Sequence, residues 1–265
     1  MTTSDQKKIA VVTGASSGIG AVYADRLAGR GYDLILVARR ADRLEALAKS
    51  ITDKHGAKVE VVAADLEKDA DLARVEKILA TNAAVRVLVN NAGLARLSPL
   101  ATSAVQNSLS QIDLNITALT RLTHAVLPGF VSRNDGVIIN IASVLAVHAM
   151  PVSSVYSGTK AYVLNFSRGL QQELAQTNVK VQVVLPASTA TEIWDLSGIP
   201  LSALNQETVM PTETLVDAAL AGFDKGEAVT WPSVADAGLW DKFDQARSTL
   251  FAATQTSRPA PRYQS

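Results

Sequence analysis

The sequence contains no cysteine, and this absence excludes several kinds of site. Without cysteine there is no disulfide, no thiolate nucleophile and no cysteine-ligated zinc, as is typical of a protein from a reducing compartment. The three histidines, His55, His124 and His148, are scattered and show none of the spacings typical of metal ligands. We therefore expect no metal site, and we expect each histidine to be structural.

An excess of charge of one sign is also missing, since 25 Lys and Arg residues balance 25 Asp and Glu residues. A neutral chain offers no basic field for nucleic acid or for an anionic membrane. No apolar run approaches the ~18 residues that a membrane span needs. Residues 1–8 are polar and lack the apolar segment of a secretory signal. We expect a soluble, cytoplasmic protein that binds neither nucleic acid nor membrane.

Apolar residues are abundant, at 48% of 265 residues, which suits one α/β domain over residues 1–265. Short apolar runs of strand length alternate with segments in which apolar residues recur at helical spacing. This alternation predicts a parallel sheet with helices on both faces, and ligands of such sheets bind beyond the carboxyl ends of the strands. The predicted strands are Ile9–Thr13, Asp33–Ala38, Val59–Ala63, 85–89, 137–141 and 181–185, with helices such as 42–55 and 69–80 between them.

A glycine-rich segment, residues 14–20 with the sequence Gly-Ala-Ser-Ser-Gly-Ile-Gly, separates the first predicted strand from a predicted helix. Glycines let the backbone turn tightly and approach a pyrophosphate closely. The N-terminus of the helix adds unpaired N–H groups and the positive end of the helix dipole. In the order strand, loop and helix, this segment predicts a dinucleotide site.

Two arginines, Arg39 and Arg40, follow the second predicted strand. An acidic residue there would bind the ribose 2′-hydroxyl of NAD, whereas an arginine can hold the 2′-phosphate of NADP. The alternative is that the arginines pair with Asp42 or Glu45 on the following helix. For Arg40 the sequence leaves both interpretations open.

Polar residues and glycine also follow later strands. Asp65 comes just after the third predicted strand, Asn91 and Gly93 follow the fourth, and Ser143 stands at the end of the fifth. The carboxyl ends of parallel strands meet at one edge, so we expect these residues near the glycine-rich segment. The alternative, that each is an ordinary loop residue, is not excluded by spacing.

Tyr156 and Lys160 are four residues apart on a predicted helix, so they share one face. A nearby ammonium favours the phenolate, which brings the tyrosine closer to use as an acid or base at neutral pH. Such pairs also occur by chance on solvated helices. Ser153 or Ser154 can cap this helix.

Asn115 lies within another helical pattern, where we expect it either to be half-buried and hydrogen-bonded or to perturb the helix.

In order and separation, these motifs resemble the short-chain dehydrogenase/reductase family, in its branch with shorter subunits. The resemblance runs from Ile9 to about Thr191. It implies a Rossmann-type doubly wound sheet of about seven strands in the order 3-2-1-4-5-6-7, and a homodimer or homotetramer. The residues that carry it are the Thr-Gly-x-x-x-Gly-x-Gly segment 13–20, Asp65, the Asn-Asn-Ala-Gly segment 90–93, Asn115, Ser143, Tyr156 and Lys160.

The resemblance implies an NADP(H)-dependent oxidoreductase that interconverts a ketone or aldehyde and an alcohol. Hydride passes between the nicotinamide and the carbonyl carbon, while Tyr156 gives its proton to the oxygen. Ser143 would hydrogen-bond that oxygen. Lys160 would hold the nicotinamide ribose and lower the pKa of Tyr156, and Asn115 would hold a water that links Lys160 to solvent.

Within the same resemblance, Arg39 determines the choice of NADP over NAD. The implied cofactor contacts are Gly14, Ser16, Ser17, Gly18, Ile19, Gly20, Arg39, Arg40, Asp65, Leu66, Asn91, Ala92, Gly93, Tyr156, Lys160, Thr189 and Thr191.

Two positions depart from a regular pattern. Ala187 stands where family members usually have glycine, so it is strained if that position needs a positive φ. Gly158 lies inside the predicted catalytic helix, which suggests close approach by another backbone or by a ligand.

Residues 190–210 are predicted to form a mobile lid rich in apolar side chains, among them Trp194. Leu145, Val147 and Met150, beyond Ser143, are expected to face it. These walls favour a hydrophobic carbonyl or alcohol substrate. The alternative is that the lid residues only pack onto the domain.

Two alternatives to this function remain open: a regulatory protein that senses NADP(H) without turnover, and another reaction such as epimerisation on the same fold. The complete set of Asn115, Ser143, Tyr156 and Lys160 argues against a sensor, and the short substrate segment argues against epimerisation.

Overall fold

The computed structural model describes residues 7–264 of the chain. Most of the polar segment predicted at residues 1–8 therefore lies outside the described residues. The chain forms two compact units, Met1–Pro232 and Ser233–Ser265. Among the described residues, no helix has both the length and the hydropathy needed to cross a bilayer.

The first unit contains a seven-stranded sheet in the order β3-β2-β1-β4-β5-β6-β7, and every neighbouring pair is parallel. Both the doubly wound architecture and the predicted strand order are confirmed. The strands are β1 (Ile9–Thr13), β2 (Asp33–Ala38), β3 (Val59–Ala63), β4 (Val85–Asn90), β5 (Gly136–Ile141), β6 (Val179–Val184) and β7 (Val229–Thr230).

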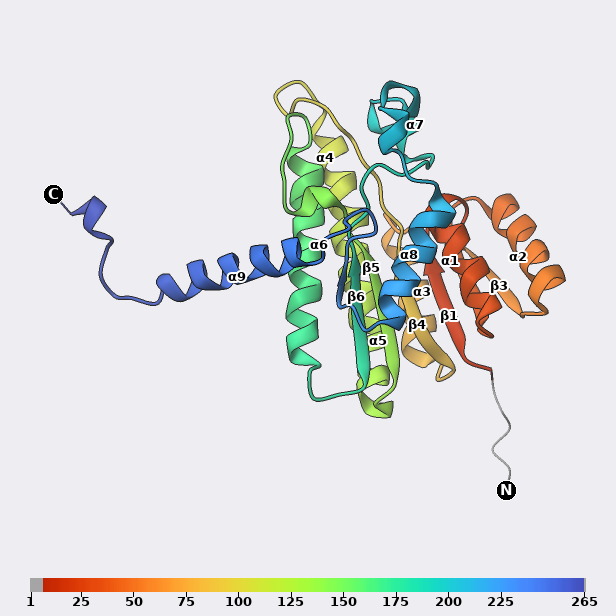
Figure 1. The fold of residues 1–265 in the computed structure, drawn as a ribbon. Helices are drawn as coiled ribbons and strands as arrows, with labels where there is room; N and C mark the ends of the chain where they lie inside the picture. The colour runs from red at the N-terminus through yellow and green to blue at the C-terminus, as the bar shows by residue number, and fades with distance from the viewer. Residues whose placement is uncertain (1–6, 265) are drawn as a thin grey trace. The chain divides into compact units, whose positions relative to one another are not determined.

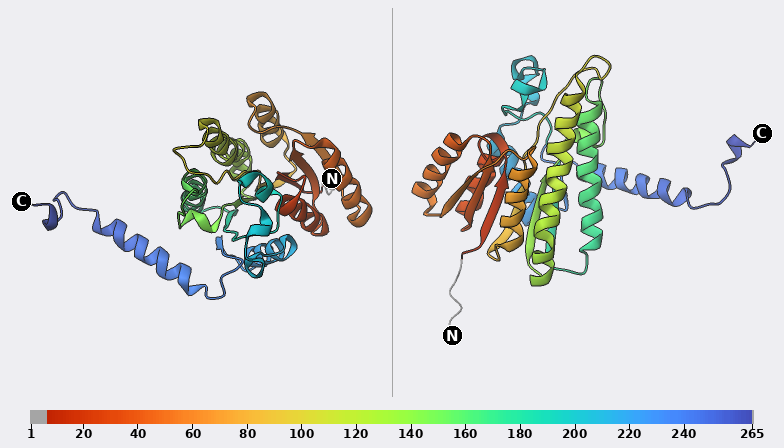
Figure 2. Two further views of the ribbon diagram at one scale, coloured as in Figure 1. Left: turned by 90° about the horizontal axis from the view of Figure 1, so that it is seen from above. Right: turned by 180° about the vertical axis from the view of Figure 1, so that it is seen from behind.

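Helices cover both faces of this sheet, as the views in Figures 1 and 2 show. Their connections between parallel strands are the crossovers that such a sheet requires. The helices of the first unit are α1 (Gly18–Gly29), α2 (Ala41–His55), α3 (Asp69–Thr81), α4 (Val105–Ile112), α5 (Leu119–Arg133), α6 (Ser154–Glu173), α7 (Ile193–Ser197) and α8 (Thr212–Asp224).

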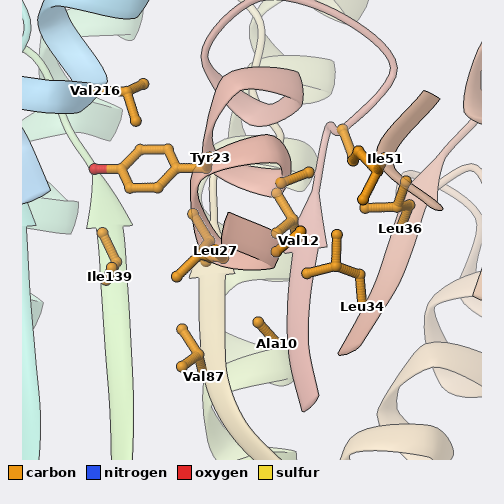
Figure 3. Packing of buried hydrophobic residues seen from close by; sticks show 14 of the residues in the cluster. Ala10, Val12, Tyr23, Leu27, Leu34, Leu36, Ile51, Val87, Ile139 and Val216 are labelled. Atoms are coloured by element: carbon orange, nitrogen blue, oxygen red, sulfur yellow. The ribbon is translucent and has the colours of Figure 1, made fainter. Parts of the chain in front are cut away.

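The sheet separates two hydrophobic layers, because successive strand residues point to opposite faces. In β1, Ala10 and Val12 belong to the layer under α1, α2 and α8, while Val11 belongs to the layer under α3, α5 and α6. Figure 3 shows the first layer, in which Tyr23 of α1 extends between Val216 and Ile139. Burial on both faces explains why the strands read as continuous apolar runs rather than alternating ones.

The strand order reverses beside β1, whose neighbours are β2 and β4. The loops after these strands therefore separate at the carboxyl edge and leave a crevice, which is where such sheets bind ligands. The short helix α7 lies beyond this same edge in Figure 1. The fold thus brings the glycine-rich segment and the lid to one end of the sheet.

The long helical pattern around Asn115 is interrupted. A π-helical segment, η1 (Asp113–Ala118), joins α4 to α5. Asn115 is 2% exposed, so it is fully buried rather than half-buried, and it also lies where the helix is perturbed. Pro128 is accommodated inside α5, which continues to Arg133.

The second unit consists mainly of α9 (Gly238–Ala253), followed by a short 3₁₀ turn, η5 (Pro261–Tyr263). None of the residues of α9 is buried, and several large apolar side chains of this helix, such as Phe243 and Leu250, are exposed.

Candidate active site

The glycine-rich segment leads directly into α1, which begins at Gly18. Gly14 and Gly18 both have positive φ, of 64° and 56°, a conformation that favours glycine. A Cβ atom at Gly20 would lie 2.5 Å from the carbonyl oxygen of Gly14. The segment therefore forms a tight turn at the N-terminus of α1, here called the glycine cradle, in which larger residues would clash with neighbouring atoms of the chain; such a turn suits a bound pyrophosphate.

Asn91 and Thr13 fasten this cradle to the loop after β4. Asn91 Nδ2 donates to the carbonyl oxygens of Thr13 and Gly14, at 2.9 and 3.2 Å. The Thr13 hydroxyl accepts from the main-chain N–H groups of Asn91 and Ala92, each at 3.0 Å. The Nδ2 group of Asn91 thus supports the glycine-rich segment, and its contact with a cofactor stays a prediction.

Arg40 lies against the glycine-rich segment. Its guanidinium donates to Ser16 Oγ, at 2.9 and 3.2 Å, and to Ser17 Oγ at 2.8 Å. Arg40 does not pair with Asp42 or Glu45; its carboxylate partner is Glu192, at 2.7 Å. Arg39 is exposed.

Two further predicted cofactor contacts, Asp65 and Leu66, differ in their exposure. Asp65 follows β3 and accepts from the main-chain N–H of Glu67 at 3.2 Å, and it remains partly exposed. Leu66 belongs to the hydrophobic layer under α3. Any contact between Leu66 and a cofactor must therefore be made by its main chain.

The side chains of Ser143 and Tyr156 interact, and this interaction acts to lower the pKa of Tyr156. Ser143 follows β5 and precedes the 3₁₀ turn η2 (Val144–Ala146), whose Leu145 donates its N–H to Ser143 Oγ at 3.1 Å. Tyr156 is in the first turn of α6. Burial raises the pKa of Tyr156 to about 12, and the interaction with Ser143 opposes that rise.

Lys160 is 5% exposed and lies on the same face of α6, with Nζ 5.7 Å from the centre of the Tyr156 ring. Its Nζ donates to the carbonyl oxygen of Ile141 at 2.9 Å, and burial lowers its pKa to about 8. The lowering of the Tyr156 pKa that we expected from this pair is not seen. Desolvation of the buried phenol is the largest cause of the raised pKa, and the Lys160 ammonium is itself buried and bonded to Ile141 O.

Asn115 connects the loop after β4 to α6. Its Oδ1 accepts from Leu94 N at 2.9 Å, and its Nδ2 donates to Leu94 O and to Thr159 Oγ1, both at 3.0 Å. A Cβ atom at Gly93 would lie 3.0 Å from Asn115 Oδ1 and 3.5 Å from Lys160 Nζ. Since both side-chain atoms of Asn115 are engaged, a water beside Lys160 would need the main chain of this segment.

Thr189, just before the lid, is held by its main-chain groups. Thr189 forms a parallel bridge with Met210, and its carbonyl oxygen accepts from Trp194 Nε1 at 2.8 Å. Among the described residues that are not glycine, only Asn134 and Val152 have positive φ. Ala187 therefore carries no such strain, and the loop does not need glycine there.

Apolar side chains remain accessible on both expected walls of the substrate region. Leu196 of the lid is 47% exposed, and Val147 and Met150 beyond Ser143 are 36% and 51% exposed. The loop after β4 joins the two walls: its Leu97 donates N–H to Ser197 O at 2.7 Å, and the next residue donates to the carbonyl oxygen of Val152 at 3.0 Å.

One expectation about α6, the side-chain cap, is wrong, and for Gly158 the approach of another part of the chain is excluded while approach by a ligand stays a prediction. Ser153 occupies the N-cap position, but its hydroxyl bonds to Met150 and to Ser157 instead of capping the helix. No described atom lies within 4 Å of a Cβ placed at Gly158, so no other part of the chain approaches it closely.

Sequence reasoning missed Glu192 and Thr159, which bind residues of the site from the lid and from α6. Neither belongs to a recognisable motif, so no pattern signals them. It also missed Val152, a β-branched residue with a φ of 65°, a strained conformation of the kind found near functional sites.

The residues present fit a dinucleotide with a phosphorylated ribose. The glycine cradle at the N-terminus of α1 suits the pyrophosphate, and the Arg40 guanidinium beside two serine hydroxyls suits a further anionic group.

The family model for short chain dehydrogenases matches residues 8–198. The very-long-chain 3-oxoacyl-CoA reductase-A of Danio rerio is 37% identical over 190 residues, which cover 70% of this chain and 59% of that protein. The chain thus spans only about three-fifths of the length of that relative.

Solved structures resemble the chain over most of its length. The short-chain dehydrogenase from Sphingobium yanoikuyae in complex with NADPH is 46% identical, with a TM-score of 0.93 and coverage of 97% of this chain and 100% of that one. The bulky-bulky ketone specific alcohol dehydrogenase from Comamonas testosteroni is 38% identical, with a TM-score of 0.90 and coverage of 97% and 99%. These matches and the motifs gathered at the carboxyl edge of the sheet show that the chain belongs to the short-chain dehydrogenase/reductase family.

Proposed function

We propose that the chain is an NADP(H)-dependent oxidoreductase that interconverts hydrophobic ketones or aldehydes and the matching alcohols. The observation that carries this proposal is the meeting of Ser143, Tyr156 and Lys160 at the sheet edge that also holds the glycine cradle and Arg40. The NADPH-bound relative from Sphingobium yanoikuyae and the ketone-specific relative from Comamonas testosteroni support it.

Tyr156 is the proton donor or acceptor at the substrate oxygen in this proposal. A pKa of about 12 keeps the phenol protonated at neutral pH, so it is ready to donate to a carbonyl oxygen. Ser143, whose side chain interacts with the phenol, would hydrogen-bond the same substrate oxygen and stabilise its developing charge. Bound NADP(H) supplies or accepts the hydride.

Lys160 and Asn115 would support Tyr156. Lys160 would hold the nicotinamide ribose hydroxyls and place a positive charge near the phenol. Asn115 positions the loop after β4 against α6 through its bonds to Leu94 and Thr159. Oxidation of NADPH by a panel of carbonyl compounds tests the activity directly, and no NADPH consumption with any of them would contradict it.

The exposed apolar walls predict how affinity changes with substrate size. Burial of apolar surface contributes about 25 cal/mol per Å², so kcat/KM should rise along a homologous ketone series. Trp194→Ala should raise KM more for bulky ketones than for small ones. Val131→Ala, an exposed apolar change near the end of α5 at the opposite edge of the sheet, is the control.

Trp194→Phe separates two roles of this side chain, because it keeps an aromatic surface and loses the bond to Thr189 O. Steady-state kinetics across the series provide the measurement. A flat or falling trend of kcat/KM with chain length would mean that the true substrate is polar.

The exposed stripe Val105, Leu109 and Ile112 on α4 predicts self-association, because three large apolar side chains share one helical face. We expect a homodimer or a homotetramer, with a mass two or four times the 28.0 kDa of the chain. Light scattering at micromolar concentration measures it, and Leu109→Glu should lower the mass. A monomer mass for the unmodified protein would exclude this assembly.

A further inference from the structure

Glu192, the residue just before α7 in the lid, binds the arginines that follow β2. Its Oε2 accepts from Arg40 Nη1 at 2.7 Å, and its Oε1 accepts from Arg43. Ser17 contributes, after the two arginines, to the lowered pKa of this carboxylate. The hydrogen bonds from Arg40 and then Arg43 lower the pKa of Glu192 to about 2, so it stays charged at neutral pH.

The donors around Glu192 are those that suit the ribose phosphate of NADP(H). Arg40 bonds to Ser16 and Ser17 of the glycine-rich segment while it holds the Glu192 carboxylate. Carboxylate and phosphate oxygens are both recognised by arginine through charge-assisted hydrogen bonds. Two anions at one such cluster would repel each other.

We propose that Glu192 is an internal competitor that occupies the 2′-phosphate position of the cofactor site and must be displaced when NADP(H) binds. The proposal rests on the NADP(H) dependence inferred above. It makes Glu192 a determinant of cofactor affinity, because only a cofactor with a 2′-phosphate competes with this carboxylate. NAD(H), which lacks that phosphate, would leave the contact with Arg40 and Arg43 in place.

The same contact ties cofactor binding to the lid. Beside Glu192, Cγ2 of Thr191 lies 3.2 Å from the position of a Cβ atom at Gly18, so this part of the lid lies over the start of α1. The lid is also fixed at Thr189, through its bridge to Met210, and at Ser197, which bonds to Leu97. Release of Glu192 therefore removes one of the contacts that hold the segment between these two points, while Trp194 Nε1 and Leu196 O keep their bonds to Thr189 and Arg96.

The first experiment compares two small probes, adenosine 2′,5′-bisphosphate and AMP, by isothermal titration calorimetry. Glu192→Gln should tighten binding of the bisphosphate by about tenfold, which corresponds to about 1.4 kcal/mol, and change AMP binding by less than about twofold. Asp195→Asn removes the same charge from an exposed lid residue that is not bonded to these arginines, and it should change neither affinity.

Hydrogen exchange of the unmodified protein provides a second measurement that needs no variant. The amides of residues 193–196 should exchange several-fold faster with adenosine 2′,5′-bisphosphate bound than with AMP bound. Slower exchange with the bisphosphate, or weaker bisphosphate binding by Glu192→Gln, would overturn the proposal and make Glu192 a support for the arginines.

The two proposals fail in different ways. Equal affinity of the unmodified protein for the bisphosphate and AMP would contradict NADP(H) dependence. The ratio of the two affinities in Glu192→Gln would still decide the role of Glu192: a shift toward the bisphosphate supports competition, and an unchanged ratio excludes it.

Discussion

Replacing Tyr156 with phenylalanine is expected to lower kcat by about 10³-fold or more, within the range of general acid–base catalysis, and to leave NADPH affinity nearly unchanged. Phenylalanine keeps the ring and its packing at the start of α6, and it removes only the hydroxyl that interacts with Ser143. Steady-state kinetics with the best ketone, together with NADPH titration, measure both effects.

Tyr162→Phe is the matched control for this experiment. It makes the same change six residues further along α6, where the hydroxyl bonds to Thr120 at 2.8 Å. We expect normal turnover from this variant. Substantial turnover by Tyr156→Phe would exclude Tyr156 as the proton donor and return the reaction type to the alternatives of a sensor or another chemistry.

A preference for NADPH over NADH is the second large effect that we expect. Reversal of charge at the arginines after β2 should invert it, because a charge-assisted contact becomes repulsion. The sequence motif favours Arg39→Asp as the inverting change, whereas the contacts of Arg40 with Ser16 and Ser17 favour Arg40→Asp. For whichever arginine holds the phosphate, kcat/KM with NADPH should fall about 100-fold.

The measurement is kcat/KM with each cofactor for both variants and for Lys49→Asp, which reverses a charge on the exposed side of α2. If only one of the two arginine variants prefers NADH over NADPH, the arginine replaced in that variant determines the choice of cofactor. If the unmodified enzyme used NADH and NADPH with equal kcat/KM, the assignment of NADP(H) itself would be wrong.

The strands of the sheet were predictable from sequence because their burial on both faces produces a recognisable local pattern of apolar residues. Runs such as Leu34-Ile35-Leu36-Val37 are apolar throughout, since residues facing either side of the sheet are buried. The glycine cradle was equally visible, because the positive φ at Gly14 and Gly18 favours glycine.

Electrostatics in the site could not be predicted in this way. The spacing of Tyr156 and Lys160 places them on one face of α6, but it carries no information about how far water is excluded from either group. Desolvation sets the direction of both pKa values here. The partner of Arg40 was equally hidden, because Glu192 lies far away in sequence, on a lid without a recognisable motif.

The π-helical segment η1 determines how far the residues of α5 are rotated relative to those of α4. A π-turn holds one residue more than an α-turn, so η1 behaves as a single-residue insertion that changes the phase of the residues after it by about 100°. Val105, Leu109 and Ile112 of α4 are exposed, whereas Leu122, Val126 and Phe130 of α5 are in the core. The extra residue lets one continuous helical rod turn its apolar stripe from solvent to sheet, so deleting one residue within η1 should convert it to ordinary α-helix and leave these two stripes in their present orientations.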